Sequence, residues 1–226
     1  MNIKKIIREV LENYNLFGGG ITPLQLGFKL KKKLGFKELR KIGEGTSGVA
    51  FSIGDGKVLK ITTDKTEYTE AMKLKGRKNN HIADVYGVYA LTGEYKDIVI
   101  IISEHLKTNP VKIDKLEDSL YNIFNNLFKN KYGYLNELIF GYQLKSKSRA
   151  LIEQIKKELF PHLEGEVKVY AEHFFNMIEE LRNLNVTSAD FGPMNLGYKK
   201  NGNLAYLDFG FGIEDESENF ANTLII

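Results

Sequence analysis

Strand-like and helix-like patterns occupy different parts of this chain, and their separation constrains the fold more than any other feature. The strand patterns come early, are short and are divided by glycine-containing turns: 37–44, 47–54, 57–63, 83–91 and 98–103. One helical pattern (66–78) interrupts them, a mostly helical region (114–183) follows, and a short hairpin pattern (196–207) comes last. Strands with a single helix, then helices, predict an α+β protein of two lobes.

The first 40 residues carry two further helical patterns and an excess of positive charge. Apolar residues recur at helical spacing over 2–14, and a second helix is expected to begin at Thr22-Pro23 and to stop near Gly35. Nine Lys or Arg and three Glu give residues 1–40 a net charge of +6, against +3 for the whole chain. This segment is either a solvated helical face or a basic arm that steers toward an acidic partner.

Composition excludes several classes of site. The 226 residues include no cysteine, which excludes disulfides, thiolate nucleophiles and cysteine-ligated metal sites. The four histidines are too scattered to suggest a metal site: His81, His105, His162 and His173. The basic residues lack an interleaved aromatic face, so we expect no sequence-specific recognition of nucleic acid.

The apolar segments are short. The longest aliphatic run, 98–102, falls far below the about 20 residues that span a bilayer. The first ten residues are charged and lack the apolar segment of a signal peptide. We therefore expect a soluble, cytoplasmic protein without a membrane partner.

A glycine-rich turn joins the first two predicted strands. Gly43, Gly45 and Gly48 have the spacing G-x-G-x-x-G, which is a weak signal by itself. In dinucleotide-binding proteins this motif joins a strand to a helix, whereas here it joins two strands. Because glycine has no side chain, such a hairpin can lie close over a triphosphate. The alternative is a flexible hairpin without a ligand.

Lys60 lies among apolar neighbours on the third predicted strand. An unpaired buried ammonium is costly, so this lysine needs an anionic partner. Glu67 and Glu70, on the following helical segment, are the candidates. The alternative is an edge-strand lysine that reaches solvent.

Two loops near the end of the chain carry carboxylate and amide side chains. Asp190 follows an amphipathic helical pattern over 167–184, and its loop continues to Asn195. Asp208 begins an Asp-Phe-Gly sequence after the last predicted strand. Asn195 and Asp208 offer the hard oxygen ligands that Mg²⁺ prefers. Taken separately, each loop is better explained as a turn rich in Asx and glycine residues, because such turns are common.

The order of these motifs resembles that of the protein-kinase-like phosphotransferases. It runs from the glycine hairpin to the strand lysine, the helix glutamate, the D-x-x-x-x-N loop and the D-F-G motif. The resemblance covers about 36–214. It implies a bilobal protein-kinase-like fold with a small antiparallel β-sheet N-lobe containing one helix and a reduced, mainly helical C-lobe. The N-lobe, with the glycine-rich loop and the hinge, would span 36–106 and the C-lobe 107–226, while 1–35 would be a basic helical extension.

The resemblance implies that the N-lobe holds ATP. Gly43, Gly45 and Gly48 would cover its phosphates, Ala50 would contact adenine, and Lys60 would contact the α- and β-phosphates.

The resemblance also implies a glutamate partner for the lysine and a hinge for adenine. Glu70 is preferred over Glu67 as the partner of that lysine. Ser103 would occupy the gatekeeper position, and backbone groups of Glu104 and Leu106 would hold adenine.

In the C-lobe, the resemblance implies the catalytic and metal-binding residues. Asp190 would orient the acceptor hydroxyl and receive its proton, while Asn195 and Asp208 would bind Mg²⁺.

Three departures from the family pattern change these expectations. The H-R-D motif reads Ser188-Ala189-Asp190, so we expect any activity to be independent of activation-loop phosphorylation. Gly192 replaces the lysine of protein Ser/Thr kinases, and with Pro193 it resembles the loop of aminoglycoside- and choline-kinase-like enzymes. Residues 211–226 leave no room for an A-P-E segment or for later helices, so we expect a reduced kinase fold.

We therefore expect an ATP- and Mg²⁺-dependent phosphotransferase, a minimal atypical Ser/Thr protein kinase whose Asp190 deprotonates the acceptor. One alternative is a small-molecule kinase. Another is a nucleotide-binding pseudokinase that acts through protein interaction, with the basic arm as its docking surface. Transfer of AMP by a reversed nucleotide is a further variant.

Overall fold

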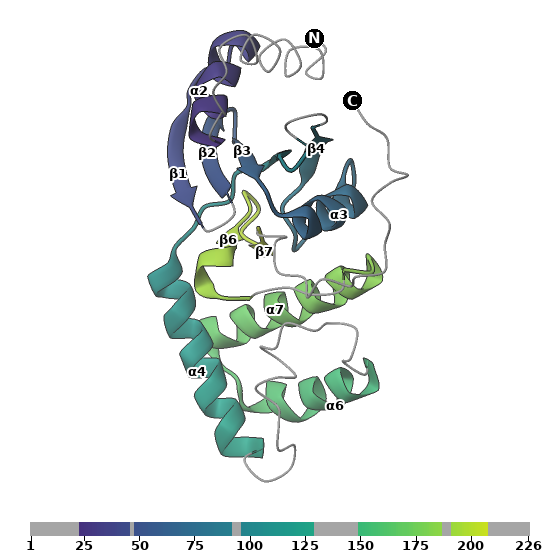
Figure 1. Cartoon of the computed structure of the whole chain (residues 1–226). Helices are drawn as coiled ribbons and strands as arrows, with labels where there is room; N and C mark the ends of the chain where they lie inside the picture. Colours follow the sequence, from purple (N-terminus) through teal and green to yellow (C-terminus); the bar gives the residue numbers. More distant parts are fainter. Residues whose placement is uncertain (1–22, 46–47, 92–95, 129–148, 187–190, 208–226) are drawn as a thin grey trace. The chain divides into compact units, whose positions relative to one another are not determined.

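The computed structural model of the chain describes residues 23–45, 48–91, 96–128, 149–186 and 191–207 (Figure 1). These residues form an α+β fold with a five-stranded antiparallel sheet, a two-stranded hairpin and several helices, so the predicted α+β class is confirmed. The chain divides into two compact units. The described residues of the first unit lie within 23–77 and 84–105, and those of the second within 78–83 and 106–207.

The first unit is built on one antiparallel sheet, whose strands lie in the order β1-β2-β3-β5-β4. All five are short and confirm the predicted strand patterns: β1 (Arg40–Glu44), β2 (Gly48–Gly54), β3 (Lys57–Thr62), β4 (Val85–Ala90) and β5 (Val99–Glu104). The turn between β2 and β3 contains Gly54 and Gly56 at φ of +83° and +68°. Because L side chains rarely adopt such angles, this turn requires its glycines.

Different helices cover the two faces of this sheet (Figure 1). α2 (Pro23–Leu34) packs against β2 and β3, and its Leu26 and Leu30 are buried with the odd-numbered apolar residues of these strands. α3 (Lys65–Leu74) contacts β4 and β5. Successive side chains of a strand point to opposite faces, so Lys60 points away from α2.

α2 approaches the sheet closely at Gly27. A Cβ atom at this position would lie 2.8 Å from the ring of Phe51, so a larger residue would force a shift. Leu26 and Leu30 are fully buried, as their helical spacing predicted. The helix ends at Gly35, whose φ of +65° is the left-handed conformation common at helix C-termini. The predicted helix before Gly35 is therefore confirmed, whereas the predicted helix over 2–14 lies outside the described residues.

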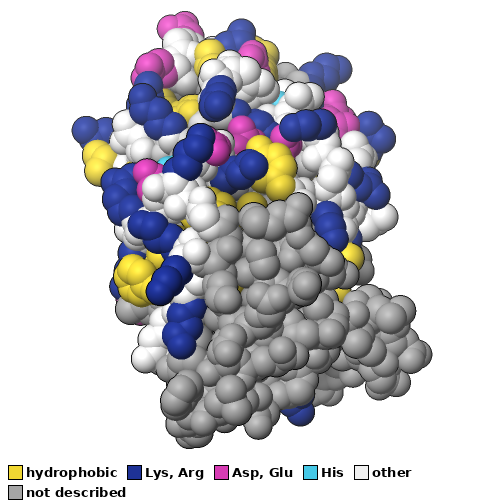
Figure 2. All heavy atoms as spheres, turned by 90° about the horizontal axis from the view of Figure 1, so that it is seen from above, with side chains coloured by type: hydrophobic (Ala, Val, Ile, Leu, Met, Phe, Trp, Pro, Cys, Tyr) yellow, Lys and Arg dark blue, Asp and Glu magenta, His cyan; other side chains and the backbone are white. Residues whose placement is uncertain are grey.

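On the face seen in Figure 2, the basic side chains of the described residues do not form a single block. Lys and Arg side chains alternate there with acidic and uncharged ones. Lys29 and Lys32 are exposed on α2, and Lys37 forms an ion pair with Asp55 (2.7 Å). This ion pair lowers the pKa of the Asp55 carboxyl. For the described part of the basic segment, the arrangement agrees with a solvated helical face.

The second unit is mainly helical. Its helices follow the predicted helical region: α4 (Pro110–Phe128), α6 (Arg149–Leu159), the short 3₁₀ helix η2 (Phe160–His162) and α7 (Gly165–Asn183). α7 buries Tyr170, Phe174 and Phe175, as expected for core residues. None of the helices in the described residues is long and apolar enough to cross a membrane.

A small hairpin completes the second unit. The 3₁₀ helix η3 (Pro193–Asn195) leads into β6 (Leu196–Tyr198), which pairs antiparallel with β7 (Leu204–Tyr206). The hairpin packs against α7 through β7 and against α4 through β6. This confirms the hairpin that the sequence predicted over 196–207.

Segment 78–83 connects α3 to β4 but belongs to the second unit. The Glu180 carboxylate of α7 accepts hydrogen bonds from the backbone N–H groups of Asn80 (2.9 Å) and His81 (2.6 Å). The Lys199 ammonium donates to the carbonyls of Asn79 (2.8 Å) and Ile82 (2.9 Å). The units are therefore not continuous in sequence, because this segment was expected within 36–106. α2, which was expected within the N-terminal extension, packs on the sheet.

Candidate functional site

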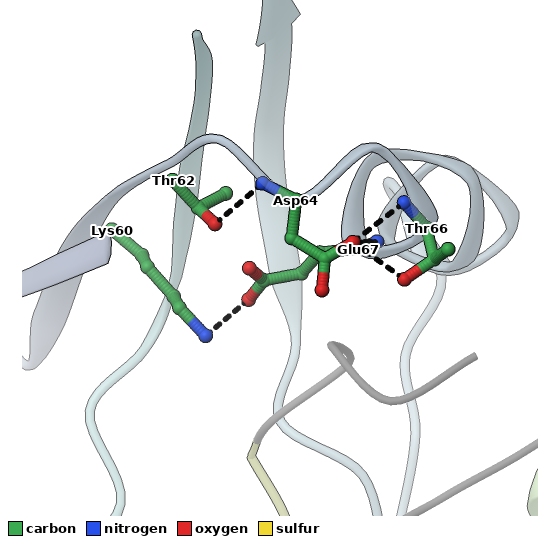
Figure 3. A network of polar contacts seen from close by, with 5 residues as sticks. All are labelled: Lys60, Thr62, Asp64, Thr66 and Glu67. Atoms are coloured by element: carbon green, nitrogen blue, oxygen red, sulfur yellow. Dashed lines mark hydrogen bonds and ion pairs between the residues drawn. The ribbon is translucent and has the colours of Figure 1, made fainter. Parts of the chain in front are cut away.

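The junction of β3 and α3 holds a charged pair (Figure 3). The Lys60 ammonium forms an ion pair with the Glu67 carboxylate. The Glu67 side chain is 2% exposed, whereas the Lys60 side chain is 26% exposed. A buried carboxylate thus holds a lysine that keeps partial access to solvent. The expectation that Lys60 has an anionic partner on the following helix is confirmed.

The first turn of α3 directs Glu67 toward Lys60. Asp64 is the N-cap of this helix: its carboxylate accepts hydrogen bonds from the N–H groups of Thr66 (2.8 Å) and Glu67 (3.4 Å). The Asp64 N–H donates to Thr62 Oγ1 (3.1 Å). In a capping box, the glutamate three residues after the cap would accept that N–H. Here Thr62 accepts it, and Glu67 pairs with Lys60.

Sequence reasoning missed the roles of Thr62 and Asp64. The signal was present, because Asp64 and Glu67 have the D-x-x-E spacing of a helix N-terminus. It would have placed Glu67 in the first helical turn, next to the end of β3.

The preference for Glu70 as the partner of Lys60 is corrected. Glu70 lies in the next turn of α3 and forms an ion pair with Lys73 (2.9 Å) on the same helix. Residues three apart are neighbours on a helix surface, so this local pair forms readily. Lys60 pairs instead with Glu67, which lies in the first turn of α3.

Ala50 lies between the glycine turn and the lysine. Gly43 pairs with Ala50 across β1 and β2, and Ala50 pairs with Lys60 across β2 and β3. Directly paired residues in antiparallel strands share a face, so Ala50 and Lys60 point to the same side of the sheet. The predicted adenine contact and the predicted phosphate contact therefore share one face of the first unit.

The three glycines of the turn differ in what they require. A Cβ atom on Gly48 would lie 2.5 Å from the carbonyl oxygen of Ile61, so the contact between β2 and β3 excludes a side chain there. A Cβ atom on Gly43 would meet nothing nearer than 3.9 Å, and one on Gly45 would meet nothing within 4 Å. Neither has a positive φ. The fold of the described residues therefore explains Gly48 but not Gly43 or Gly45.

The end of β5 contains two of the predicted hinge residues. Ser103 is buried and pairs with Val58 of β3. The Glu104 N–H donates to the carbonyl of Asp84 (2.8 Å). Any hinge role for Glu104 therefore falls to its carbonyl oxygen. The third predicted residue, Leu106, is buried in the second unit.

In the second unit, Asn195 lies at the end of η3. Its N–H donates to the carbonyl of Gly192 (2.8 Å), and its own carbonyl accepts from the N–H of Leu207 (3.0 Å). This bond continues the register of β6 and β7 by one pair. Asp208 is the next residue in the sequence, and both it and Asp190 lie outside the described residues.

The described residues thus contribute to two separate groups of predicted site residues. The first unit carries the paired lysine and the glycine turn, and the second carries Asn195. Within the described ranges, no three His, Asp or Glu side chains gather as a metal site would require. No protein-family model matches this chain, and no curated protein matches it either.

Proposed function

We propose that this chain is an ATP- and Mg²⁺-dependent phosphotransferase with a protein-kinase-like fold, and that its acceptor is a Ser or Thr hydroxyl of a protein. The observation that carries the proposal is the ion pair between Lys60 and the buried Glu67. The buried carboxylate fixes the direction of the ammonium, and the lysine keeps partial access to solvent. A lysine that must contact phosphate needs both access and a fixed direction.

The arrangement of the first unit supports this proposal. The sheet has five antiparallel strands, and one helix lies between its third and fourth strands. This arrangement is compatible with the small lobe that the family resemblance implies. The lysine comes from the third strand and the glutamate from the helix, as in the family pattern.

The Lys60 ammonium would neutralise charge on the α- and β-phosphates. Phosphoryl transfer is accelerated mainly by alignment of the reactants and by neutralisation of the triphosphate charge. Because Glu67 holds the ammonium in place before substrate binds, little reorganisation would be needed at the moment of reaction.

The glycines at positions 43 and 45 are a further argument for a ligand above the sheet. The packing and backbone angles of the described residues leave room for a side chain at both positions. Close approach of the backbone to a phosphate is one reason for glycine that packing does not provide.

The residues of the second unit would act on the acceptor and the metal. Asp190 would orient the acceptor hydroxyl and take its proton. The hydroxyl oxygen would form a bond to the γ-phosphorus while the bond from that phosphorus to the β,γ-bridging oxygen breaks. Asn195 and Asp208 would hold Mg²⁺, which when bound offsets the negative charge of the phosphates. The hydrogen bond between Asn195 and Leu207 fits this role, because it holds the residue before Asp208 against Asn195.

Transfer from ATP tests the proposal. Purified protein is incubated with Mg²⁺, ATP labelled at the γ-phosphate and a cell lysate as the source of acceptors. We expect labelled Ser or Thr, and we expect both Asp190→Ala and Lys60→Met to abolish the label. Lys57→Met, on the same strand but exposed, is the matched control and should retain it. Absence of both autophosphorylation and lysate labelling contradicts the protein-kinase proposal.

A small-molecule acceptor is the second candidate. Pro193 begins η3 directly after Gly192, so the loop lacks the lysine of protein Ser/Thr kinases and starts a rigid turn instead. Label on a metabolite from a defined library, with none on protein, would favour this candidate. Binding of Mg²⁺ and ATP without any turnover would favour the pseudokinase.

A further inference from the structure

One backbone group at the start of α3 has two possible acceptors, and the choice between them affects Glu67 (Figure 3). The group is the N–H of Asp64, which donates to Thr62 Oγ1 (3.1 Å). The other possible acceptor is the Glu67 carboxylate, because a glutamate three residues after an N-cap can reach back to the N–H of the cap. In this structure the Glu67 carboxylate forms an ion pair with Lys60 instead.

The side chain of the N-cap is already fully engaged. The Asp64 carboxylate accepts hydrogen bonds from Thr66 N–H (2.8 Å), from Thr66 Oγ1 (2.6 Å) and from Glu67 N–H (3.4 Å). These bonds fix the first turn of α3 whichever acceptor the Asp64 N–H uses. The direction of the Glu67 side chain therefore depends on which group takes that N–H.

The sheet fixes the position of the Thr62 hydroxyl. Thr62 is the last residue of β3, is fully buried and pairs with Gly48 of β2 and Val99 of β5. Residues two apart on a strand point to the same face, so Thr62 lies on the face of Lys60. Because strands on both sides hold this residue, the hydroxyl is presented to the Asp64 N–H in a defined place.

Burial gives the choice of acceptor a consequence. A buried N–H without an acceptor is costly, so loss of the Thr62 hydroxyl leaves the Asp64 N–H in need of another one. The Glu67 carboxylate is the acceptor that a capping box uses. It is also the group that holds Lys60, and its side chain is 2% exposed. The Asp64 N–H and the Lys60 ammonium thus compete for one carboxylate unless Thr62 takes the N–H.

We propose that Thr62 is a positioning residue: its hydroxyl accepts the Asp64 N–H and thereby leaves the Glu67 carboxylate to hold Lys60. The effect of Thr62 on phosphotransfer rests on the proposed function, whereas its effect on the partner of Glu67 does not. Loss of the hydroxyl alone should therefore turn the Glu67 carboxylate from Lys60 toward the Asp64 N–H.

Thr62→Val tests this directly, because valine keeps the branched shape that suits a strand and lacks the acceptor. Crystal structures of the wild type and the variant give the readout. In the variant we expect the Glu67 carboxylate at hydrogen-bond distance from the Asp64 nitrogen and separated from the Lys60 ammonium. Thr62→Ser keeps the acceptor and should keep the wild-type contacts. A Glu67 carboxylate that stays on Lys60 in Thr62→Val overturns the proposal.

Nuclear Overhauser effects between the Lys60 and Glu67 side chains follow the same contact in solution. Thr62→Ala, which also lacks the acceptor, serves if Thr62→Val does not fold. We expect these effects in the wild type and in Thr62→Ser, and their loss in the variant without a hydroxyl. Equal effects in all variants contradict the assignment.

A double-mutant cycle tests whether Thr62 acts through Glu67. We expect Thr62→Val to lower kcat for ADP formation about tenfold, as loss of one hydrogen bond of ordinary strength does. We expect Thr62→Ser, which keeps the acceptor, to lower it about threefold or less. In the Glu67→Gln background, Thr62→Val should cause no further loss, because the group through which it acts is already changed. Losses that multiply in the double variant overturn the proposal.

Thr69→Val is the matched control. Thr69 lies on α3, and its hydroxyl donates to the carbonyl of Lys65 (3.4 Å), away from the cap. We expect this variant to change neither the contact between Glu67 and Lys60 nor kcat. If the wild type itself forms no ADP with any acceptor, the phosphotransferase proposal fails, and the structures of Thr62→Val and Thr62→Ser still decide the role of Thr62.

Discussion

Lys60 and Glu67 form a pair in which only the lysine reaches solvent. Taking a carboxylate out of water is costly, and the attraction of a nearby ammonium offsets that cost only with good geometry. The N-cap at Asp64 provides this geometry, because it fixes the first turn of α3 and with it the direction of Glu67. Glu67 sets the position of Lys60, and the position of Glu67 depends in turn on Asp64 and on Thr62, which accepts the Asp64 N–H. Neither Asp64 nor Thr62 has a chemical role of its own in the proposed reaction.

Substitution of Glu67 and of Glu70 by glutamine, one at a time, distinguishes the roles of the two carboxylates. We expect Glu67→Gln to lower the rate of ATP turnover about 100-fold, because a displaced reacting group costs that much. We expect Glu70→Gln to change the rate about threefold or less, since its partner Lys73 lies on the helix surface. Initial rates of ADP formation at saturating Mg²⁺ and ATP, with acceptor present, measure both. A larger loss in Glu70→Gln than in Glu67→Gln would contradict the assignment of the pair.

Alanine substitutions in the glycine turn distinguish a role in packing from a role in ligand binding. We expect Gly48→Ala to lower the free energy of unfolding by about 1–3 kcal/mol, because its Cβ atom would press on the Ile61 carbonyl. We expect Gly45→Ala to change that free energy by less than about 0.5 kcal/mol, because its Cβ atom meets open space.

Because Gly45→Ala should leave stability unchanged, its effect should appear only in the affinity for a nucleotide. A methyl group between the turn and a phosphate should weaken binding of a non-hydrolysable ATP analogue, which calorimetry measures, while urea unfolding measures stability. Unchanged affinity in Gly45→Ala would remove the glycine turn from the proposed site.

At the scale of elements, α2 is part of the first unit. Its buried leucines complete the apolar cluster on the face of the sheet opposite to Lys60. Packing of α2 on that face gives β2 and β3 rigid support beneath a site on the face of Lys60.

Truncation of a buried side chain on α2 measures this support. We expect Leu30→Ala to lower the free energy of unfolding by about 2–5 kcal/mol, because Leu30 is fully buried against the strands. Lys32→Ala, on the exposed side of the same helix, is the control and should change it by about 0.5 kcal/mol or less. Urea unfolding followed by circular dichroism gives both values. A negligible effect of Leu30→Ala would show that the sheet is stable without α2.

At the scale of the whole molecule, the chain passes between its two units three times in the described residues, near 77, 83 and 105. Segment 78–83 is held in the second unit by charged side chains from distant positions, Glu180 and Lys199. Hydrogen bonds to charged groups are stronger than neutral ones, so six residues suffice to anchor the connection between α3 and β4.

Stability should depend on pH through His173. Its folded pKa is lowered from 6.5 by burial and by His81, so the unfolded chain binds more protons in the interval between the two values. Stability is then fully present above about pH 6.5 and falls as the pH drops toward the folded pKa. We expect His173→Gln to flatten this dependence in urea titrations between pH 5 and 7, and His162→Gln, at an exposed position, to preserve it. An unchanged slope in His173→Gln would contradict the linkage.

The sequence by itself determined the elements and the fold class. Short strands between glycine turns, the helix that ends at Gly35 and the apolar stripe of α7 follow from local spacing and backbone preference. These signals act over a few residues, so they could be read without knowing which elements meet.

The tertiary structure decided which residues meet. It placed Glu67 rather than Glu70 against Lys60, packed α2 on the sheet and joined segment 78–83 to α7. Most of these contacts depend on the angle and distance between elements that are far apart in the chain. The contact between Glu67 and Lys60 depends on the helix cap at Asp64. Local periodicity specifies the face that an element buries, but not the partner that covers it.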